Sequence, residues 1–154
     1  FQLLILLATI LSSGCSVSNT KPVSESQIDT IELEQLANIA YDNESWEKVI
    51  RYYRTLTNKI SNDEKLWYRL GNAYAQLNNT ESAIDAYKTA LTINSNYSMI
   101  LHNLAITQLQ ESTKTFLELE KYTGANDPLN LRARLAIKAI ATLLNKEYKI
   151  EIDN

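Results

Sequence analysis

Residues 64–97 read EKLWYRLGNAYAQLNNTESAIDAYKTALTINSNY, and this stretch decides the fold. Its apolar residues recur every three or four positions in two runs separated by a polar segment, which is the pattern of two amphipathic helices joined by a turn. When the chain is compared with itself, the pattern returns at one fixed offset, so that Leu70-Gly71 lies over Leu36-Ala37 and over Leu104-Ala105. An offset of about 34 residues is typical of a fold in which each repeat is one pair of helices.

The same stretch resembles the consensus of the tetratricopeptide repeat (TPR). Seven consensus positions are occupied at the right spacing, namely Trp67, Leu70, Gly71, Tyr74, Ala83, Tyr87 and Ala90. Gly71 and Ala83 would let the two helices of a pair approach closely, while the aromatic side chains would fill the space between pairs. The resemblance implies an all-α fold, a short right-handed solenoid of three helix pairs with a C-terminal capping helix.

The repeat divides the chain into units. Residues 28–124 are expected to hold three TPR units, at about 30–63, 64–97 and 98–124, and the second helix of the third unit is expected early, at about 113–122. Asp127-Pro128 then gives a cap and a first-turn proline for a helix over 127–146, followed by a tail over 147–154. Because the end of a helical stack needs a cover, this last helix is expected to seal the third unit.

Composition agrees with one helical domain and limits the partners. The chain has 154 residues, of which 45% are apolar, and its 3 glycines and 2 prolines are too few for the frequent turns of an all-β fold. The net charge of −3 provides no positive field that would attract a polyanion, so nucleic acid is not expected as a partner.

The first residues read as a targeting segment. The apolar run at 1–11 is too short to span a bilayer and leads into Ser12-Ser13-Gly14-Cys15. This resembles a bacterial lipoprotein signal, with Ser12 where the lipobox usually has Leu. The resemblance implies a signal peptide over 1–14 whose start is truncated, acylation of Cys15, a flexible tether over 15–27, and a place on the periplasmic face of the outer membrane. The alternatives are a plain secretory signal with a bystander cysteine and a short buried helix.

In the TPR family, the first helix of each pair lines a concave groove that receives a peptide or a helix of a partner protein. Transferred to this sequence, the groove positions include Glu34, Met99 and Ile106. The candidate partner-binding residues among them are Asn38, Tyr41, Lys65, Tyr68, Arg69, Asn72, Gln76, His102 and Asn103. The bland alternative is a solvated helix face. One TPR subset grips a C-terminal carboxylate with Lys, Asn, Asn, Lys and Arg. Only Asn38 agrees with that set, so capture of a carboxylate tail is not supported.

No pattern in the sequence indicates chemistry. His102 is the only histidine, and the sequence contains no Gly-rich phosphate loop, no metal-ligand spacing and no nucleophile with a base. The chain is therefore expected to be no enzyme and to hold no cofactor and no metal, with an unrecognised active site as the least favoured alternative.

The expected function is that of a membrane-anchored adaptor that binds a protein. Small TPR lipoproteins of this layout resemble pilotin-like components of type IV and tight-adherence pilus systems, which implies a role in assembling a pilus or a secretion system. The alternative is an adaptor for cell-wall (peptidoglycan) enzymes.

Overall fold

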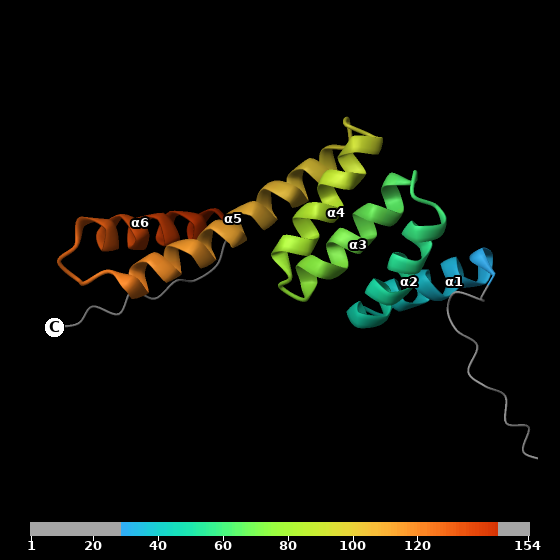
Figure 1. Cartoon of the computed structure of the whole chain (residues 1–154), viewed down its shortest axis with the longest axis horizontal. Helices are drawn as coiled ribbons and strands as arrows, with labels where there is room; N and C mark the ends of the chain where they lie inside the picture. Colours follow the sequence, from blue (N-terminus) through green and yellow to red (C-terminus); the bar gives the residue numbers. More distant parts are fainter. Residues whose placement is uncertain (1–28, 145–154) are drawn as a thin grey trace, which may run out of the picture.

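The computed structural model describes residues 29–144, and every regular element in that range is an α-helix. There are six: α1 (Thr30–Asp42), α2 (Trp46–Lys59), α3 (Glu64–Gln76), α4 (Thr80–Ile93), α5 (Ser98–Tyr122) and α6 (Pro128–Leu143). Each helix packs mainly on its neighbour in sequence, and α5 also contacts α3 (Figure 1). The expected all-α TPR solenoid is therefore confirmed.

The turns inside the first two helix pairs have the same geometry. Glu44 and Asn78, which occupy equivalent positions of the two units, both adopt the left-handed conformation, with φ of 53° and 56°. In each case the amide of the next residue, Ser45 or Asn79, donates a hydrogen bond of 2.9 Å to the carbonyl five residues back. This closure satisfies the last carbonyls of the first helix and sets the angle at which the second helix returns.

The close approach of α3 and α4 depends on Gly71. A methyl group at this position would lie 2.5 Å from Cε1 of Tyr87, and that ring is buried. The expectation that Gly71 allows the pair to pack closely is confirmed. Around this contact the apolar core runs through both pairs and includes Leu33, Ala37, Val49, Tyr53, Leu56, Leu70, Ala73, Ala83, Ala86, Ala90 and Ile100.

The third unit differs from the prediction. The sequence predicts a break before residue 113, but α5 is one continuous helix of 25 residues. The position that corresponds to Glu44 and Asn78 is Ser112. Its hydroxyl donates a hydrogen bond of 2.9 Å to the carbonyl of Gln108 inside the helix. Residues 104–112 contain no glycine or asparagine that would favour a left-handed turn and no proline that would end the helix, so the helix continues.

The second half of α5 is covered by α6, which takes the place of the expected second helix of the third unit. Asp127 caps α6 by accepting a hydrogen bond of 2.8 Å from the backbone amide of Leu129, and Pro128 is in the first turn, as the sequence predicted. The face of α6 that is buried on α5 consists of Asn130, Ala133, Ile137 and Ile140. The expected end at residue 146 falls outside the described residues.

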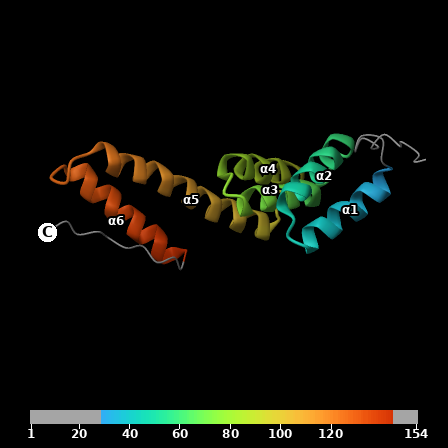
Figure 2. The ribbon, with the colours of Figure 1, turned by 90° about the horizontal axis from the view of Figure 1, so that it is seen from below.

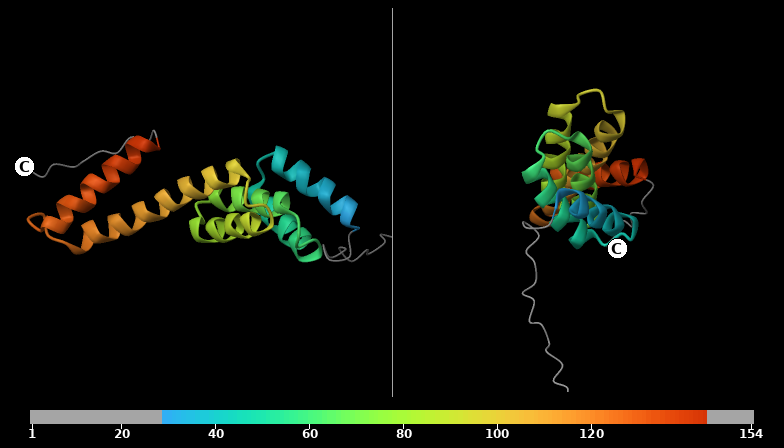
Figure 3. Two further views of the ribbon diagram at one scale, coloured as in Figure 1. Left: turned by 90° about the horizontal axis from the view of Figure 1, so that it is seen from above. Right: turned by 90° about the vertical axis from the view of Figure 1, so that its right-hand side faces the viewer.

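The described part of the molecule is elongated, with α1 at one end and the α5–α6 hairpin at the other (Figures 1 and 2). The N-terminal half of α5 lies on the second pair, whereas its C-terminal half and α6 extend beyond that pair (Figure 3). Within residues 29–144, no helix is both long enough and apolar enough to cross a membrane.

Candidate functional site

The first helices of successive units, α1, α3 and α5, present one continuous polar and aromatic surface. Two pockets of about 260 Å³ each are lined by residues of this surface. We call this surface the groove. Its lining comes from α1, α3 and α5 and also includes the buried rings of Tyr53 from α2 and Tyr87 from α4.

The first pocket lies where α1, α2 and α3 meet. Its lining combines both signs of charge, from Glu34, Asp63, Lys65 and Arg69, with three phenol rings, Tyr53, Tyr68 and Tyr97, and with Asn38 and Leu66. The Tyr68 and Tyr97 rings lie 5.9 Å apart, and Tyr68 also lies 6.2 Å from Tyr87. This pocket can therefore hold an aromatic or aliphatic group next to a charged one.

The second pocket lies where α3 and α5 meet the end of α1. It is lined by Tyr41, Trp46, Asn72, Gln76, Tyr87, Asn103, Ile106 and Thr107, none of which carries a formal charge. Tyr41 and Trp46 stand edge to face, with ring centroids 5.6 Å apart. Amide groups beside aromatic rings suit an uncharged segment that presents backbone hydrogen-bonding groups.

A polar network fixes the walls between these pockets. At its first node, the Asn38 side-chain oxygen accepts a hydrogen bond of 2.9 Å from the Tyr53 hydroxyl and another from the Arg69 guanidinium. Arg69 also donates a hydrogen bond of 2.6 Å to the Tyr53 hydroxyl, and its guanidinium carbon lies 5.2 Å from the centre of the Tyr41 ring. Arg69 of α3 is thus held by α1 and α2 together.

The second node is centred on Asn72. Its side-chain oxygen accepts a hydrogen bond of 2.8 Å from the Tyr87 hydroxyl and one of 3.0 Å from the side-chain amide of Asn103. Its own amide donates a hydrogen bond of 2.7 Å to the Tyr41 hydroxyl. The Asn103 amide also donates a hydrogen bond of 3.4 Å to the Tyr68 hydroxyl. One asparagine therefore links α1, α3, α4 and α5.

The two nodes are copies of each other. Asn38 and Asn72 occupy equivalent positions of successive units, as do Tyr53 and Tyr87, and in both units the tyrosine of the second helix donates to the asparagine of the first. Burial raises the pKa of both phenols, so each stays a neutral hydrogen-bond donor well beyond physiological pH. The candidate residues Asn38, Asn72 and Arg69 thus hold the helices of the groove together through hydrogen bonds, and we call these three residues the braces.

The remaining candidate residues differ in their accessibility. Lys65 and Gln76 are exposed and line the first and second pocket, respectively. Tyr41, Tyr68 and Asn103 are half-buried and offer ring faces or one amide edge. His102 is exposed on α5 and lines neither of these pockets. Cys15 lies outside the described residues.

Sequence reasoning missed several groove residues. Trp46, Tyr53 and Tyr97 line the pockets, although none belongs to the first helix of a unit. A signal for Tyr53 was present, because the same Asn–Tyr spacing recurs in both units at the repeat offset. No comparable signal marks Trp46 and Tyr97, which follow turns and reach the groove only through the packing of neighbouring units.

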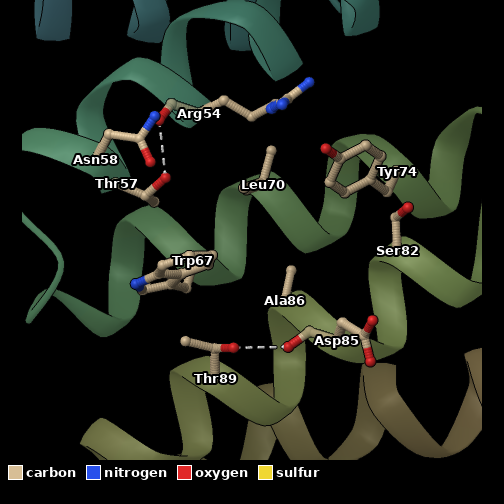
Figure 4. A pocket seen from close by; sticks show the side chains of 10 residues that line it. All are labelled: Arg54, Thr57, Asn58, Trp67, Leu70, Tyr74, Ser82, Asp85, Ala86 and Thr89. Atoms are coloured by element: carbon tan, nitrogen blue, oxygen red, sulfur yellow. Dashed lines mark hydrogen bonds between the residues drawn. The ribbon is translucent and has the colours of Figure 1, made fainter.

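A third pocket, of about 280 Å³, lies on the opposite side of α3, between α2 and α4 (Figure 4). Leu70 and Ala86 lie between the rings of Trp67 and Tyr74, with Arg54 on the α2 side and Asp85 on the α4 side. Trp67 is oriented by a bond of 2.9 Å from its indole nitrogen to the carbonyl of Ser61. This pocket is separate from the groove.

Between residues 29 and 144, no three side chains of His, Cys, Asp or Glu come together in a way that could hold a metal ion. The network around Asn38 and Asn72 consists of neutral amides and phenols plus one guanidinium, which is suited to holding a shape and to donating hydrogen bonds.

Comparison with known proteins agrees with this geometry. Residues 64–97, which form α3, α4 and the turn that follows, match the family model described as tetratricopeptide repeat. Residues 64–97 therefore form a tetratricopeptide repeat, a kind of module that binds proteins.

The chain is also similar to peroxisomal targeting signal receptors of yeasts. It is 33% identical to the receptor of Kluyveromyces lactis over 100 residues, which is 65% of this chain and 17% of that protein. It is 31% identical to the receptors of Candida glabrata and Saccharomyces cerevisiae, in each case over 74 residues, which is 48% of this chain and 12% of the relative. The chain thus spans less than a fifth of the length of these relatives.

Proposed function

We propose that the chain is an adaptor whose groove binds an extended segment of a protein partner across both pockets. The observation that carries this proposal is the pair of 260 Å³ pockets, which follow one another along α1, α3 and α5. Extended chains advance about 3.3 Å per residue, so a segment of several residues could place one side chain in each pocket. The relatives are named as receptors of a targeting signal, which supports a recognition role for these helices.

The contacts would be divided between the two pockets. In the first, Lys65 offers an exposed ammonium group, and Glu34 and Asp63 offer carboxylates, next to the Tyr68 and Tyr97 rings. This setting suits an apolar side chain beside a polar or charged one. In the second, Gln76 offers an exposed amide that can both donate to and accept from a peptide backbone. The partner segment is therefore expected to carry an apolar side chain beside a polar or charged one at one end and uncharged residues at the other.

The internal network supports binding without contacting the partner through most of its groups. The Asn38 and Asn72 oxygens each already accept two hydrogen bonds, so the aromatic walls are fixed before a partner arrives. A preformed site loses less conformational entropy on binding. Recognition then depends on the exposed residues, and stability depends on the braces.

Photo-crosslinking in living cells tests this proposal. Benzoylphenylalanine would replace Lys65 or Gln76 in the groove, and Lys88, exposed on α4, would be the matched control. The expected result is one protein crosslinked from both groove positions and not from position 88. Crosslinks of equal strength from all three positions, or none from the groove, would refute groove binding.

We extend the proposal to the cellular setting, where the support is the sequence alone. The segment before α1 resembles a lipoprotein signal, so we infer acylation of Cys15 and a place on the periplasmic face of an outer membrane. Incorporation of a labelled fatty acid that is lost in Cys15→Ser would support the anchor. Unchanged labelling of that variant would eliminate it.

The identity of the crosslinked protein separates the two roles for such an adaptor. Recovery of a pilus or secretion component would favour the assembly role, whereas recovery of peptidoglycan enzymes alone would replace it with the cell-wall role. Turnover of a substrate by the purified chain, abolished by a groove variant, would overturn the adaptor proposal altogether.

A further inference from the structure

The helices at the two ends of the molecule both carry exposed apolar ridges. On α1, Ile31 and Ile39 are 68% and 58% exposed, with Gln35 between them. On α6, Leu131, Leu135 and Leu143 are 57%, 57% and 70% exposed, with Ala139 completing the row. Residues four apart form the ridges by which helices pack on one another.

These ridges face away from the helices that α1 and α6 pack on. The buried residues of α1 are Leu33, Ala37 and Ala40, and those of α6 include Ala133 and Ile137. Solenoids normally end in repeats with a polar outer face, which keeps them soluble. Within residues 29–144, the helices at both ends depart from that rule, and exposed apolar rows of this kind mark interaction surfaces.

The charges around the two ridges are opposite. Helix α1 contains Glu32, Glu34 and Asp42 and no basic residue, and Glu32 and Asp42 flank its ridge. Helix α6 contains Arg132, Arg134 and Lys138 and no acidic residue, and Arg132 and Lys138, both exposed, flank its ridge. Each ridge therefore repels a copy of itself and attracts the other.

We propose that the chain assembles head to tail, with the α6 ridge of one copy packed on the α1 ridge of the next. The two helices lie at opposite ends of the elongated molecule (Figures 1 and 3), so one copy can engage a neighbour at each end. Such a heterologous contact forms a ring if its rotation closes and an open filament if it does not. One crossing of two helices is a small interface, so association is expected at roughly 10–100 µM protein.

The test is sedimentation equilibrium of the full chain in a density-matched non-ionic detergent, over a range of protein concentrations. The expected result is a mass that rises beyond the dimer with concentration and falls as salt is raised, because exposed charges are screened. A single monomer at concentrations up to about 500 µM would overturn the proposal.

Two variants identify the geometry. Ile39→Lys places a cation against the basic α6 ridge, and Leu135→Glu places an anion against the acidic α1 ridge. Each variant alone should be monomeric, and an equimolar mixture of the two should form a 1:1 heterodimer and nothing larger, because the α6 ridge of Ile39→Lys and the α1 ridge of Leu135→Glu are the only intact pair. Leu101→Glu on α5, at a position 49% exposed and outside both ridges, is the matched control and should associate as the wild type does.

The alternative outcomes are distinct. A dimer that persists in Ile39→Lys but is lost in Leu135→Glu, with no restoration on mixing, would mean symmetric pairing of α6 and would refute the head-to-tail contact. Loss of association in Leu101→Glu would show that the ridges are not responsible. Far-UV circular dichroism of each variant establishes that a loss of association is not a loss of fold.

Discussion

The replacement Gly71→Ala tests the packing that brings α3 and α4 together. The added Cβ would lie 2.5 Å from Cε1 and 2.6 Å from Cδ1 of Tyr87, about 1 Å closer than carbon atoms normally approach. The ring cannot swing away freely, because it is buried and its hydroxyl is bonded to Asn72 at 2.8 Å. Relief of the clash must therefore separate the two helices or break that hydrogen bond.

The magnitude follows from two opposing effects. Overpacking of a core costs about 1–3 kcal/mol, and a lost hydrogen bond costs about 1 kcal/mol more. The higher helix propensity of alanine offsets about 1 kcal/mol. We therefore expect Gly71→Ala to lower the free energy of unfolding by about 1–3 kcal/mol, measured by urea denaturation at 25 °C.

Two controls isolate the cause. Gly124→Ala adds a methyl group where no atom lies within 4 Å, so its effect should be neutral or slightly stabilising. In a Tyr87→Leu background the ring is absent, and Gly71→Ala should become stabilising by about 1 kcal/mol through helix propensity alone. A Gly71→Ala protein as stable as the wild type, or the same loss in both backgrounds, would refute the packing argument.

Three further predictions concern the turns and the network. Glu44→Gly should raise the free energy of unfolding by about 0.5–1 kcal/mol, because it relieves the left-handed conformation at φ 53°. Glu47→Gly in the first turn of α2 should instead lower it, by at most about 1 kcal/mol. Asn72→Leu should lower it by about 2 kcal/mol because three side chains lose a partner, while Gln76→Ala should change it by less than about 0.5 kcal/mol; equal effects would contradict the division into braces and contacts. The free energy of unfolding should fall as the pH rises above 10. The Tyr53 and Tyr87 phenols ionise at about pH 10 in the unfolded chain, whereas their pKa values are raised in the folded chain. In urea titrations at alkaline pH, Tyr87→Phe should therefore lose less of its free energy of unfolding than the wild type.

The sequence predicted the first two helix pairs well because their information is local. The fixed repeat offset and the small residue at Gly71 depend on a few residues at fixed spacing, although its contact with Tyr87 inside the pair was not predicted. The prediction for the third unit was wrong because it relied on the repeat offset without a local signal for the turn. Its pattern of apolar residues continued, but Ser112 replaced the residue that makes the turn in the other units, and the periodicity alone did not show this.

The candidate site was predicted in outline only. Mapping the first helices placed Lys65, Gln76 and the asparagines on one surface, which is a consequence of helical periodicity. The distinction between exposed contacts and internal braces could not be predicted, since it depends on hydrogen bonds between side chains far apart in the sequence. Trp46 and Tyr97 reach the groove through tertiary packing, which no spacing in the sequence describes.

The most direct test is a crystal structure of the chain bound to the segment that the Gln76 crosslink identifies. The segment is expected to lie along α1, α3 and α5, with one side chain beside Tyr68 and Lys65 and its backbone beside Gln76, while the bonds of Asn38 and Asn72 remain as they are. A segment bound on the outer faces of α2 and α4, or one that displaces these asparagine bonds, would contradict the account.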